Sequence, residues 1–325
     1  MTLTAVPGIR VGHGEVPGGG SGCTAILGPF RGAVEILGMA TGSRELHVLS
    51  PRHLAERVDA LLLTGGSAFG LGAADGVMAW LEERGLGFDT GLARVPLVPA
   101  AVLFDLATGV GRPGPEEGRR ACESAVVDPV PEGRVGAGAG ATVGKLHGME
   151  GAAPGGVGSA SGSLETRGLG RGVVGALAVV NALGAVFGED GRVLAGEGGV
   201  WTGARGSPGP WGRGGGDGDP KAGGFPAGAN TTLTVVATDL PLSRVELGKV
   251  AGMAAAALAR TIAPVGTPFD GDMVFAVSTS QEAVDATPGD VLAVGVLARE
   301  LLEESIRRAV SADARVSSRA PREGP

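Results

Sequence analysis

One junction in the chain combines a hydroxyl nucleophile with a segment that could release it. Thr231 follows Asn230 and opens the β-branched run TTLTVVAT, which ends at Thr238. The preceding stretch, residues 204–228, reads ARGSPGPWGRGGGDGDPKAGGFPAG and is too rich in Gly and Pro for a helix or a strand. A threonine hydroxyl between a flexible linker and a core strand is suited to attack the carbonyl group before it. This pattern indicates self-cleavage between Asn230 and Thr231.

Such a cut would create a catalytic pair on a single residue. The released α-amine of Thr231 titrates near ~7.7–8.0 when unperturbed, so it can act as a general base at neutral pH. A threonine hydroxyl activated by its own N-terminal amine is an established form of nucleophilic catalysis. The simpler alternative is that Thr231 merely begins a strand, and the spacing alone leaves that alternative open.

Other motifs in the chain fall short of the patterns they resemble. Gly65–Gly70 reads GGSAFG, but Phe69 occupies the last glycine of the nucleophile elbow G-x-S-x-G. GAGATVGK, which ends at Lys145, lacks the Ser or Thr that follows the lysine of a phosphate-binding loop. The four histidines have no metal-ligand spacing, and DGD at 217–219 lacks the rest of a calcium loop. The sequence therefore predicts neither a cofactor nor a metal.

The composition indicates a compact protein with a core of small side chains. The 325 residues include 62 Gly and 21 Pro, yet 43 % are hydrophobic, which excludes disorder of the whole chain. Aromatic residues are scarce, with 8 Phe, 3 Trp and no Tyr. The net charge of −7 and the lack of a basic cluster argue against a nucleic-acid partner.

Cysteine content and hydropathy give evidence about the cellular compartment of the protein. Cys23 and Cys122 are the only cysteines, and we expect both to be buried free thiols. The N-terminal segment has no basic region followed by an apolar run, so no secretory signal is predicted. The most apolar stretch, Val173–Phe187, is too short to span a bilayer and contains Asn181. These features predict a cytoplasmic protein without a membrane partner.

The hydrophobic pattern predicts alternating elements on both sides of the junction. Before it, we expect β-rich runs at 24–27 and 33–39, a helix over 68–84, an extended stretch at 95–106, a short helix at 116–126, loops or a site of close backbone approach over 133–162, and a buried strand pair or strand and turn at 172–187. After it, we expect a strand at 231–238, a helix from a capping box at Ser243 and Glu246 to about Ile262, a strand at 273–278 and a helix from about Val291 to Val310. This order predicts a layered domain of sheet and helices.

Four stretches of the sequence resemble one enzyme family. They are LTGGSAFGLGAADGVMAWLEERGLGFDTG (63–91), RVPLVPAAVLFDL (94–106), GAGATVGK (138–145) and NTTLTVVATDLPL (230–242). Together they resemble the β-peptidyl aminopeptidase / L-aminopeptidase–D-esterase family of N-terminal-nucleophile hydrolases, and within it the branch of endo-type nylon-oligomer hydrolases. The resemblance covers nearly the whole chain apart from the linker and the tail.

The resemblance implies an α+β fold, a four-layer αββα sandwich. It also implies a precursor cut into a larger segment, 1–230, and a smaller one, 231–325, which form one domain and usually a homotetramer. We place the flexible linker at about 204–229 and a disordered tail at about 312–325.

The resemblance assigns roles around the junction. Thr231 matches the nucleophile and Asn230 the residue before the cut. Asp270 and Asp272 match two acidic residues that orient the nucleophile and its amine. Their i, i+2 spacing would put both on one face if the strand begins there. The alternative is a solvated acidic turn before Met273.

Two further residues are matched at a distance along the chain. Asn181 matches the side-chain amide that donates to the developing oxyanion, the alternative being a core asparagine bonded to backbone. Lys145 resembles the active-site lysine, which could lower the pKa of the nucleophile's ammonium by like-charge repulsion. Its alternative is a solvated loop lysine, and the spacing to Asn181 is longer than the family pattern, with extra residues around 150–156.

Departures from the aminopeptidase branch bear on the substrate. That branch has a Ser-x-Glu-like pair, which helps hold the substrate's free amine, where this chain has Asp270 and Asp272. It also uses a phenolic hydroxyl, and this chain has no Tyr. Both differences favour internal cleavage of linear amides such as 6-aminohexanoate (nylon) oligomers or related peptides.

Three other functions remain open from the sequence. The first is an aminopeptidase for β- or D-amino-acid peptides, and the second is acyl transfer to an amine, as in ornithine acetyltransferase-like enzymes. The third is a Gly/Ala-rich assembly or binding protein without catalytic activity.

Overall fold

The computed structural model describes residues 1–109, 111–200 and 230–319. Its main sheet consists of β1 (Arg10–Glu15), β2 (Gly22–Ile36), β3 (Ser43–Arg44), β4 (Val58–Thr64), β7 (Ala100–Val102), β10 (Gly156–Thr166), β11 (Gly170–Asn181), β14 (Thr231–Thr238) and β16 (Met273–Ser278). The strands follow the order β10-β11-β14-β16-β2-β4-β7-β3, with β1 paired to β2. Strands from both sides of residue 230 therefore share one sheet.

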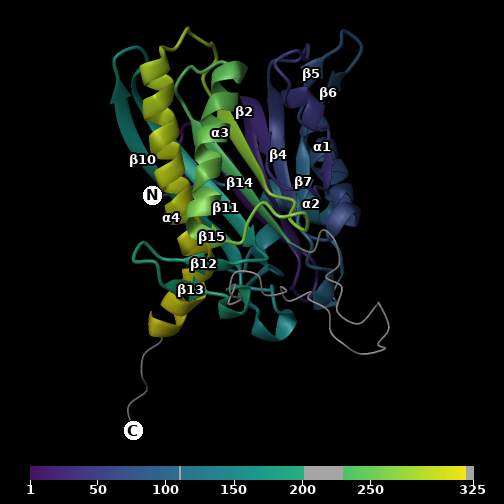
Figure 1. Cartoon of the computed structure of the whole chain (residues 1–325). Helices are drawn as coiled ribbons and strands as arrows, with labels where there is room; N and C mark the ends of the chain where they lie inside the picture. The colour runs from purple at the N-terminus through teal and green to yellow at the C-terminus, as the bar shows by residue number, and fades with distance from the viewer. Residues whose placement is uncertain (110, 201–229, 320–325) are drawn as a thin grey trace.

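The sheet is divided into two packed halves by its longest strand. The first part of β2 pairs with β4, and its last part pairs with β16. In the described part of the chain, four α-helices cover the outer faces: α1 (Ala73–Glu82), α2 (Pro115–Glu123), α3 (Arg244–Thr261) and α4 (Pro288–Arg319). Figure 1 shows α3 and α4 on one side of the strands and α1 and α2 on the other. The layers run helix, sheet, sheet, helix, which confirms the predicted αββα sandwich.

Alternation along the strands assigns each side chain to a layer. Leu233 and Val235 of β14 belong to the core between the two sheets, together with Leu63 of β4. Val236 belongs instead to the core beneath α3 and α4. Because the side-chain period of a strand is two, Thr231 lies on the same side as Leu233, between the sheets. The fold thus directs the candidate nucleophile toward the interior.

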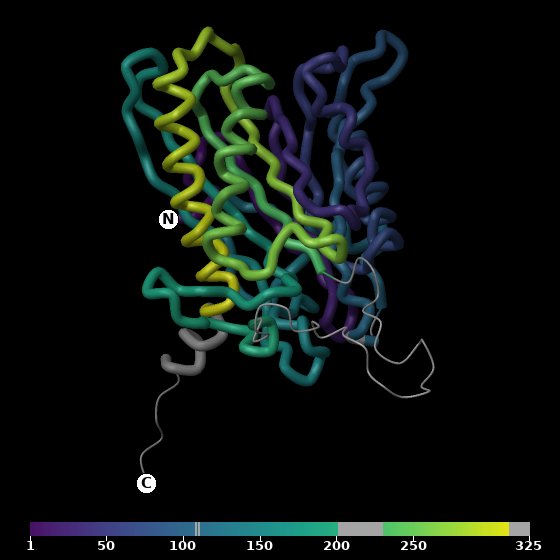
Figure 2. Tube along the Cα trace, in the orientation of Figure 1, coloured from purple at the N-terminus to yellow at the C-terminus, as the bar shows by residue number. Residues whose placement is uncertain are grey.

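Smaller elements connect these layers. They are the pairs β5 (Phe88–Asp89) with β6 (Arg94–Val95) and β8 (Thr142–Val143) with β9 (Ala153–Pro154), and the three-stranded sheet of β12 (Ala185–Phe187), β13 (Val193–Ala195) and β15 (Ile262–Ala263). The path of the chain through them can be followed in Figure 2. Short 3₁₀ helices occur at Leu3–Ala5, Leu46–Leu49, Ser67–Gly72, Leu106–Thr108, Gly136–Gly138, Met149–Gly151 and Glu197–Gly199.

The segment after the junction matches its predicted elements. The strands at 231–238 and 273–278 are β14 and β16. Helix α3 opens with the predicted capping box, in which the backbone N–H of Glu246 donates to Ser243 Oγ and the N–H of Ser243 donates back to Glu246 Oε2. Helix α4 continues to Arg319, beyond its predicted end at about Val310.

The region 133–162, predicted as loops or a site of close backbone approach, contains both a strand and such an approach. Part of it forms β10, which pairs along its whole length with β11. A Cβ at Gly158 would lie 2.1 Å from the Ser305 carbonyl oxygen of α4. Glycine is needed there because the helix backbone packs directly on the strand. The two predicted runs at 24–27 and 33–39 likewise merge into β2, which ends at Ile36.

Other expectations concern the linker, the thiols and the membrane. The predicted linker and the DGD sequence at 217–219 lie outside the described residues. Cys23 and Cys122 are buried free thiols, as predicted. Within the described ranges, the chain forms no helix that is long and apolar enough to cross a membrane.

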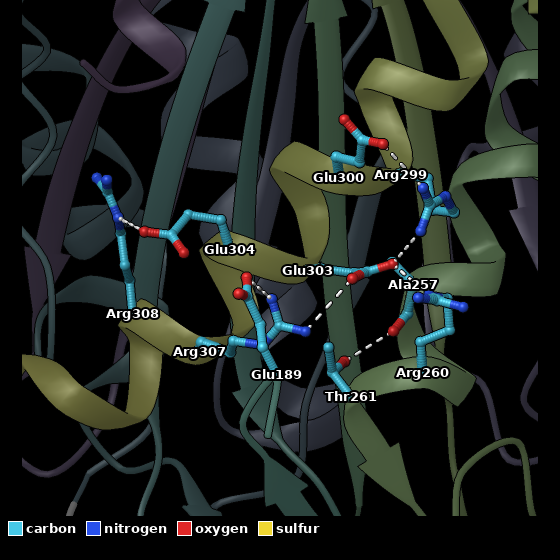
Figure 3. Close-up of polar contacts among 10 residues, drawn as sticks. All are labelled: Glu189, Ala257, Arg260, Thr261, Arg299, Glu300, Glu303, Glu304, Arg307 and Arg308. Carbon is cyan, nitrogen blue, oxygen red and sulfur yellow. Dashed lines mark hydrogen bonds and ion pairs between the residues drawn. The ribbon is translucent and has the colours of Figure 1, made fainter. Parts of the chain in front are cut away.

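A buried carboxylate joins the two helices of one outer layer. Glu303 of α4 is 7 % exposed and accepts from Arg260 Nε of α3 at 2.6 Å. It also accepts from Arg299 and from Arg307 Nη2, the latter at 3.3 Å. Figure 3 shows the three guanidinium groups around this side chain. The charge of Glu303 is therefore balanced by several donors rather than by a single exposed ion pair.

We expect Glu303→Gln to lower the free energy of unfolding by about 2 kcal/mol, because three arginines lose their common charged acceptor. The control is Glu300→Gln, which removes an exposed partner of Arg299 and should cost less than about 0.5 kcal/mol. Urea denaturation of both variants checks this. Equal losses in the two would contradict a special role for Glu303.

A histidine on β1 is held in its neutral form. His13 Nδ1 lies 2.9 Å from Thr24 Oγ1, and the buried Nε2 has no hydrogen-bond partner within the described part of the chain. Burial lowers the pKa of His13 to about 4. The group therefore gains a proton at higher pH in the unfolded chain than in the folded one, so its contribution to stability is lost as pH falls from about 6.5 toward 4.

His13→Asn should flatten the acid side of the stability profile. Asn keeps a polar atom near the position of Nδ1 but does not titrate, so the loss of up to about 1.4 kcal/mol per pH unit below pH 6.5 should shrink. Urea midpoints between pH 7 and 4.5 provide the measurement, with the exposed His47→Asn as control. Parent and variants should all carry Thr231→Ala, so that each is measured as one uncut polypeptide. A slope unchanged from the parent would show that His13 is not the titrating group.

Candidate active site

The candidate nucleophile lies directly against the carbonyl it would attack. Thr231 is 2 % exposed, and its Oγ1 donates to the Asn230 carbonyl oxygen at 2.5 Å. The same oxygen accepts the backbone N–H of Gly271 at 2.9 Å. A carbonyl that receives a fixed N–H donor is polarised, and that donor would stabilise negative charge on the oxygen. Sequence reasoning missed Gly271, whose backbone group has no signal in the residue pattern.

Close approach explains why the residue between the two aspartates is glycine. A Cβ on Gly271 would lie 2.7 Å from Thr231 Oγ1 and 3.0 Å from the Ala40 carbonyl oxygen. Any side chain there would displace the hydroxyl or the loop that faces it.

Asp270 and Asp272 are buried rather than part of a solvated turn, since each is 1 % exposed. Asp272 Oδ1 accepts from the N–H of Thr232 at 2.6 Å, and its Oδ2 accepts from the N–H of Gly266 at 3.1 Å. Asp270 Oδ2 accepts from the N–H of Thr267 at 2.8 Å. The bond from Thr232 attaches the loop before β16 to the start of β14, and the other two bonds lie within that loop.

The i, i+2 spacing of Asp270 and Asp272 was predicted to put them on one face only if the strand began there, and it does not. Strand β16 begins at Met273, after both aspartates, so their i, i+2 relation is not the alternation of a strand. The Asp272 carboxylate is instead positioned by the N–H of Thr232, the residue after the candidate nucleophile, and Asp270 by the N–H of Thr267 in its own loop. The backbone of Asp270 also forms a bridge with that of Asn230.

Asn181 is brought beside Thr231 by strand register. It is the last residue of β11, and its Cα is paired with that of Thr231, the first residue of β14. Its Oδ1 accepts from the N–H of Thr142 at 3.0 Å, while its Nδ2 donates to the Phe104 carbonyl oxygen at 3.0 Å. The amide is therefore held in one orientation by partners on both of its ends.

Lys145 is a buried neighbour of this amide, not a solvated loop residue. It is 3 % exposed, and its Nζ donates to Asn181 Oδ1 at 2.9 Å and to the Asn181 carbonyl oxygen at 3.1 Å. The backbone N–H of Lys145 donates to the Leu183 carbonyl oxygen at 2.8 Å, which ties the loop after β8 to the end of β11. The longer spacing between Lys145 and Asn181 thus does not separate them in space.

The electrostatics of the site follow from burial. Burial lowers the pKa of the Lys145 ammonium to about 7, against the opposing charges of Asp270, Asp105 and Asp272. Burial and then repulsion from Asp270 raise the pKa of Asp272 to about 7. Burial also raises the pKa values of Asp270 and Asp105. Three carboxyl groups and one amine therefore share one desolvated region.

Metal binding is a separate question for this acidic region. In the ranges that the structure describes, no group of three or more His, Cys, Asp and Glu residues could hold a metal ion.

A family model and curated relatives match almost the whole chain. The model of peptidase family S58 matches residues 2–322. An uncharacterized aminopeptidase of Mycobacterium tuberculosis is 40 % identical over 335 residues, covering 94 % of this chain and 92 % of the relative. A 6-aminohexanoate-oligomer endohydrolase of Agromyces sp. is 31 % identical over 316 residues, covering 93 % and 84 %.

Solved structures agree with the fold. A β-aminopeptidase of Burkholderia sp. has a TM-score of 0.67 at 22 % identity, and an L-aminopeptidase D-Ala-esterase/amidase of Ochrobactrum anthropi, described as a variant of the N-terminal-nucleophile hydrolase fold, has 0.67 at 21 %. Each similarity covers 95 % of this chain and 85 % of the other. By the extent of the family match and the identity of its relatives, the chain belongs to peptidase family S58 and is a hydrolase of peptide or related amide bonds.

Proposed function

We propose that the chain cuts itself between Asn230 and Thr231 and then uses Thr231 as an N-terminal nucleophile against linear amides. The observation that carries this proposal is the contact between Thr231 Oγ1 and the Asn230 carbonyl oxygen, with the Gly271 N–H on the same oxygen. The hydroxyl, the scissile carbonyl and a donor for the oxyanion are thus assembled in the uncut chain.

Self-cleavage follows from this geometry in two steps. Thr231 Oγ1 forms a bond to the Asn230 carbonyl carbon, and the Gly271 N–H holds the negative charge that develops on the oxygen. The bond from that carbon to the Thr231 nitrogen then breaks, and the hydroxyl proton ends on the released amine. Water hydrolyses the resulting ester, which frees the Asn230 carboxylate and restores the Thr231 hydroxyl.

In the mature enzyme the α-amine of Thr231 serves as the general base. It takes the hydroxyl proton during attack on a substrate amide and returns it to the leaving amine. The nearby Lys145 ammonium opposes protonation of that amine by like-charge repulsion. Asn181 Nδ2 donates to the substrate oxyanion, and Lys145, bonded to the oxygen of the same amide, strengthens it as a donor.

The substrate class we favour is a linear oligomer such as 6-aminohexanoate oligomers or related peptides. Asp270 and Asp272 already accept backbone N–H groups that hold the loop, so their place in the fold supports a structural and electrostatic role rather than capture of a substrate ammonium. The relative named a 6-aminohexanoate-oligomer endohydrolase agrees with this choice.

An aminopeptidase for β- or D-amino-acid peptides is the second candidate, because the relatives at 40 % identity carry the name aminopeptidase. Hydrolysis of free-amine and amine-blocked forms of one oligomer separates the two. Equal rates of hydrolysis for the two forms favour internal cleavage. Hydrolysis of the free-amine form alone, with the blocked form left intact, favours the aminopeptidase. The homotetramer and the cytoplasmic location stay predictions.

Thr231→Val should abolish self-cleavage, because it keeps the β-branched shape of the residue but removes the attacking hydroxyl. In the wild type, intact-mass analysis should find fragments of about 22–23 and 9–10 kDa by length, the smaller beginning TTLTVV. The variant should remain a single chain of 31.9 kDa.

The matched control is Thr232→Val, which removes the neighbouring buried hydroxyl and should leave cleavage intact. A wild-type chain that stays whole on incubation would overturn the proposed function.

Gly271→Ala should slow self-cleavage by about 10²-fold, since its methyl group must displace the hydroxyl or the N–H donor by a substantial fraction of an ångström. The fraction of uncut chain is followed by mass after refolding from urea. Gly252→Ala, at an exposed helical position with open space around it, is the control and should process at the wild-type rate. Wild-type kinetics in Gly271→Ala would remove Gly271 from the cleavage step.

A further inference from the structure

A third buried carboxylate lies next to the site and was not among the predicted residues. Asp105 follows β7 and is 4 % exposed. Its Oδ1 accepts the backbone N–H of Gly66 at 2.7 Å, and a Cβ on Gly65 would lie 2.3 Å from Asp105 Oδ2 and 2.5 Å from Ser21 Oγ. Segments far apart in the sequence therefore meet at this side chain.

The surroundings of Asp105 are built from backbone. A Cβ on Gly65 would lie 2.3 Å from Asp105 Oδ2, and a Cβ on Gly140 would lie 2.7 Å from the same atom. Gly66 has φ +80°, a conformation that side-chain-bearing residues rarely adopt. The glycines leave the space that the carboxylate occupies, so this is a fitted site for a charged group.

One hydrogen bond and one electrostatic interaction connect this region to the candidate catalytic groups. The residue before it, Phe104, accepts Asn181 Nδ2 on its carbonyl oxygen at 3.0 Å. Asp105 also acts electrostatically on Lys145, whose Nζ bonds the oxygen end of the same Asn181 amide. The pair Phe104–Asp105 therefore influences both ends of one amide group.

We propose that Asp105 is a positioning residue, which anchors the Phe104 carbonyl against Asn181 and balances the positive charge of Lys145. This inference rests on the proposed function, because it assigns a role within that reaction. Asp105 acts through Asn181 and Lys145 and does not touch the reacting atoms.

The charges around Lys145 give the inference a measurable consequence. The ammonium faces Asp270, Asp105 and Asp272, and after cleavage also the α-amine of Thr231. Burial lowers the pKa of Lys145 to about 7, and each of the three carboxylates opposes this change. Asn in place of Asp105 removes one of them, so Lys145 should lose its proton at a lower pH.

The test is the rate at which the mature enzyme hydrolyses a 6-aminohexanoate oligomer between pH 6 and 9, measured on chains that intact mass shows to be cut. In Asp105→Asn we expect the alkaline limb of the profile to move to lower pH by about 0.5–1 unit and the maximal rate to fall about tenfold. The matched control is Asp59→Asn, a partly buried carboxylate that accepts the Leu97 N–H at 2.8 Å outside the site. It should keep the wild-type pH profile.

Ser21→Ala provides a milder variant should Asp105→Asn fail to fold. It removes a hydroxyl group beside the carboxylate and should shift the same limb in the same direction by a smaller amount. A profile at the wild-type position in the folded variants, even with a lower rate at every pH, would overturn the positioning role. An uncut wild-type chain would overturn the proposed function as well, so the two failures are distinguishable.

Discussion

The burial of charge at the ends of β11 and β14 is the constraint on which the surrounding structure depends. A desolvated carboxylate is costly unless hydrogen bonds replace its water, and here backbone N–H groups do so for Asp105, Asp270 and Asp272. Where the backbone packs directly against such a carboxylate, a Cβ atom on the packed residue would collide with it, so that residue must be glycine. The glycines at 65 and 140 are examples, so part of the high glycine content follows from the need to hold buried charge.

The same constraint links the order of folding to the proposed chemistry. Strand β14 is paired on one side with β11 and on the other with β16, so Thr231 lies inside a sheet and not at its edge. A chain that began at Thr231 would have to bury a charged ammonium while those strands assembled. A peptide bond at this position is neutral, so folding as one chain and cutting afterwards avoids that cost.

Local patterns in the sequence predict much of this molecule, and contacts between distant backbones do not. The strand from Thr231 and the helix capped by Ser243 follow from β-branched runs and a capping box, both of which are short-range signals. Strand β10 lies in a region predicted as loops or a site of close backbone approach, and the strand itself was not predicted because its glycines fit a helix packed on it and have no periodicity. Gly271 and Asp105 were missed for the same reason, since their roles depend on approach to residues far along the chain.

The balance of charge also bears on the amine that the proposed cleavage would release. In the uncut chain three carboxyl groups face one ammonium, that of Lys145, and the pKa of Asp272 is raised to about 7 by burial and by repulsion from Asp270. A protonated Asp272 relieves that repulsion before cleavage. The proposed cleavage adds a second amine, at Thr231, to the same region, and repulsion from the Lys145 ammonium favours the neutral form of that amine. The charge that folding already buries therefore prepares the new amine to act as a base, next to the hydroxyl group that it must deprotonate.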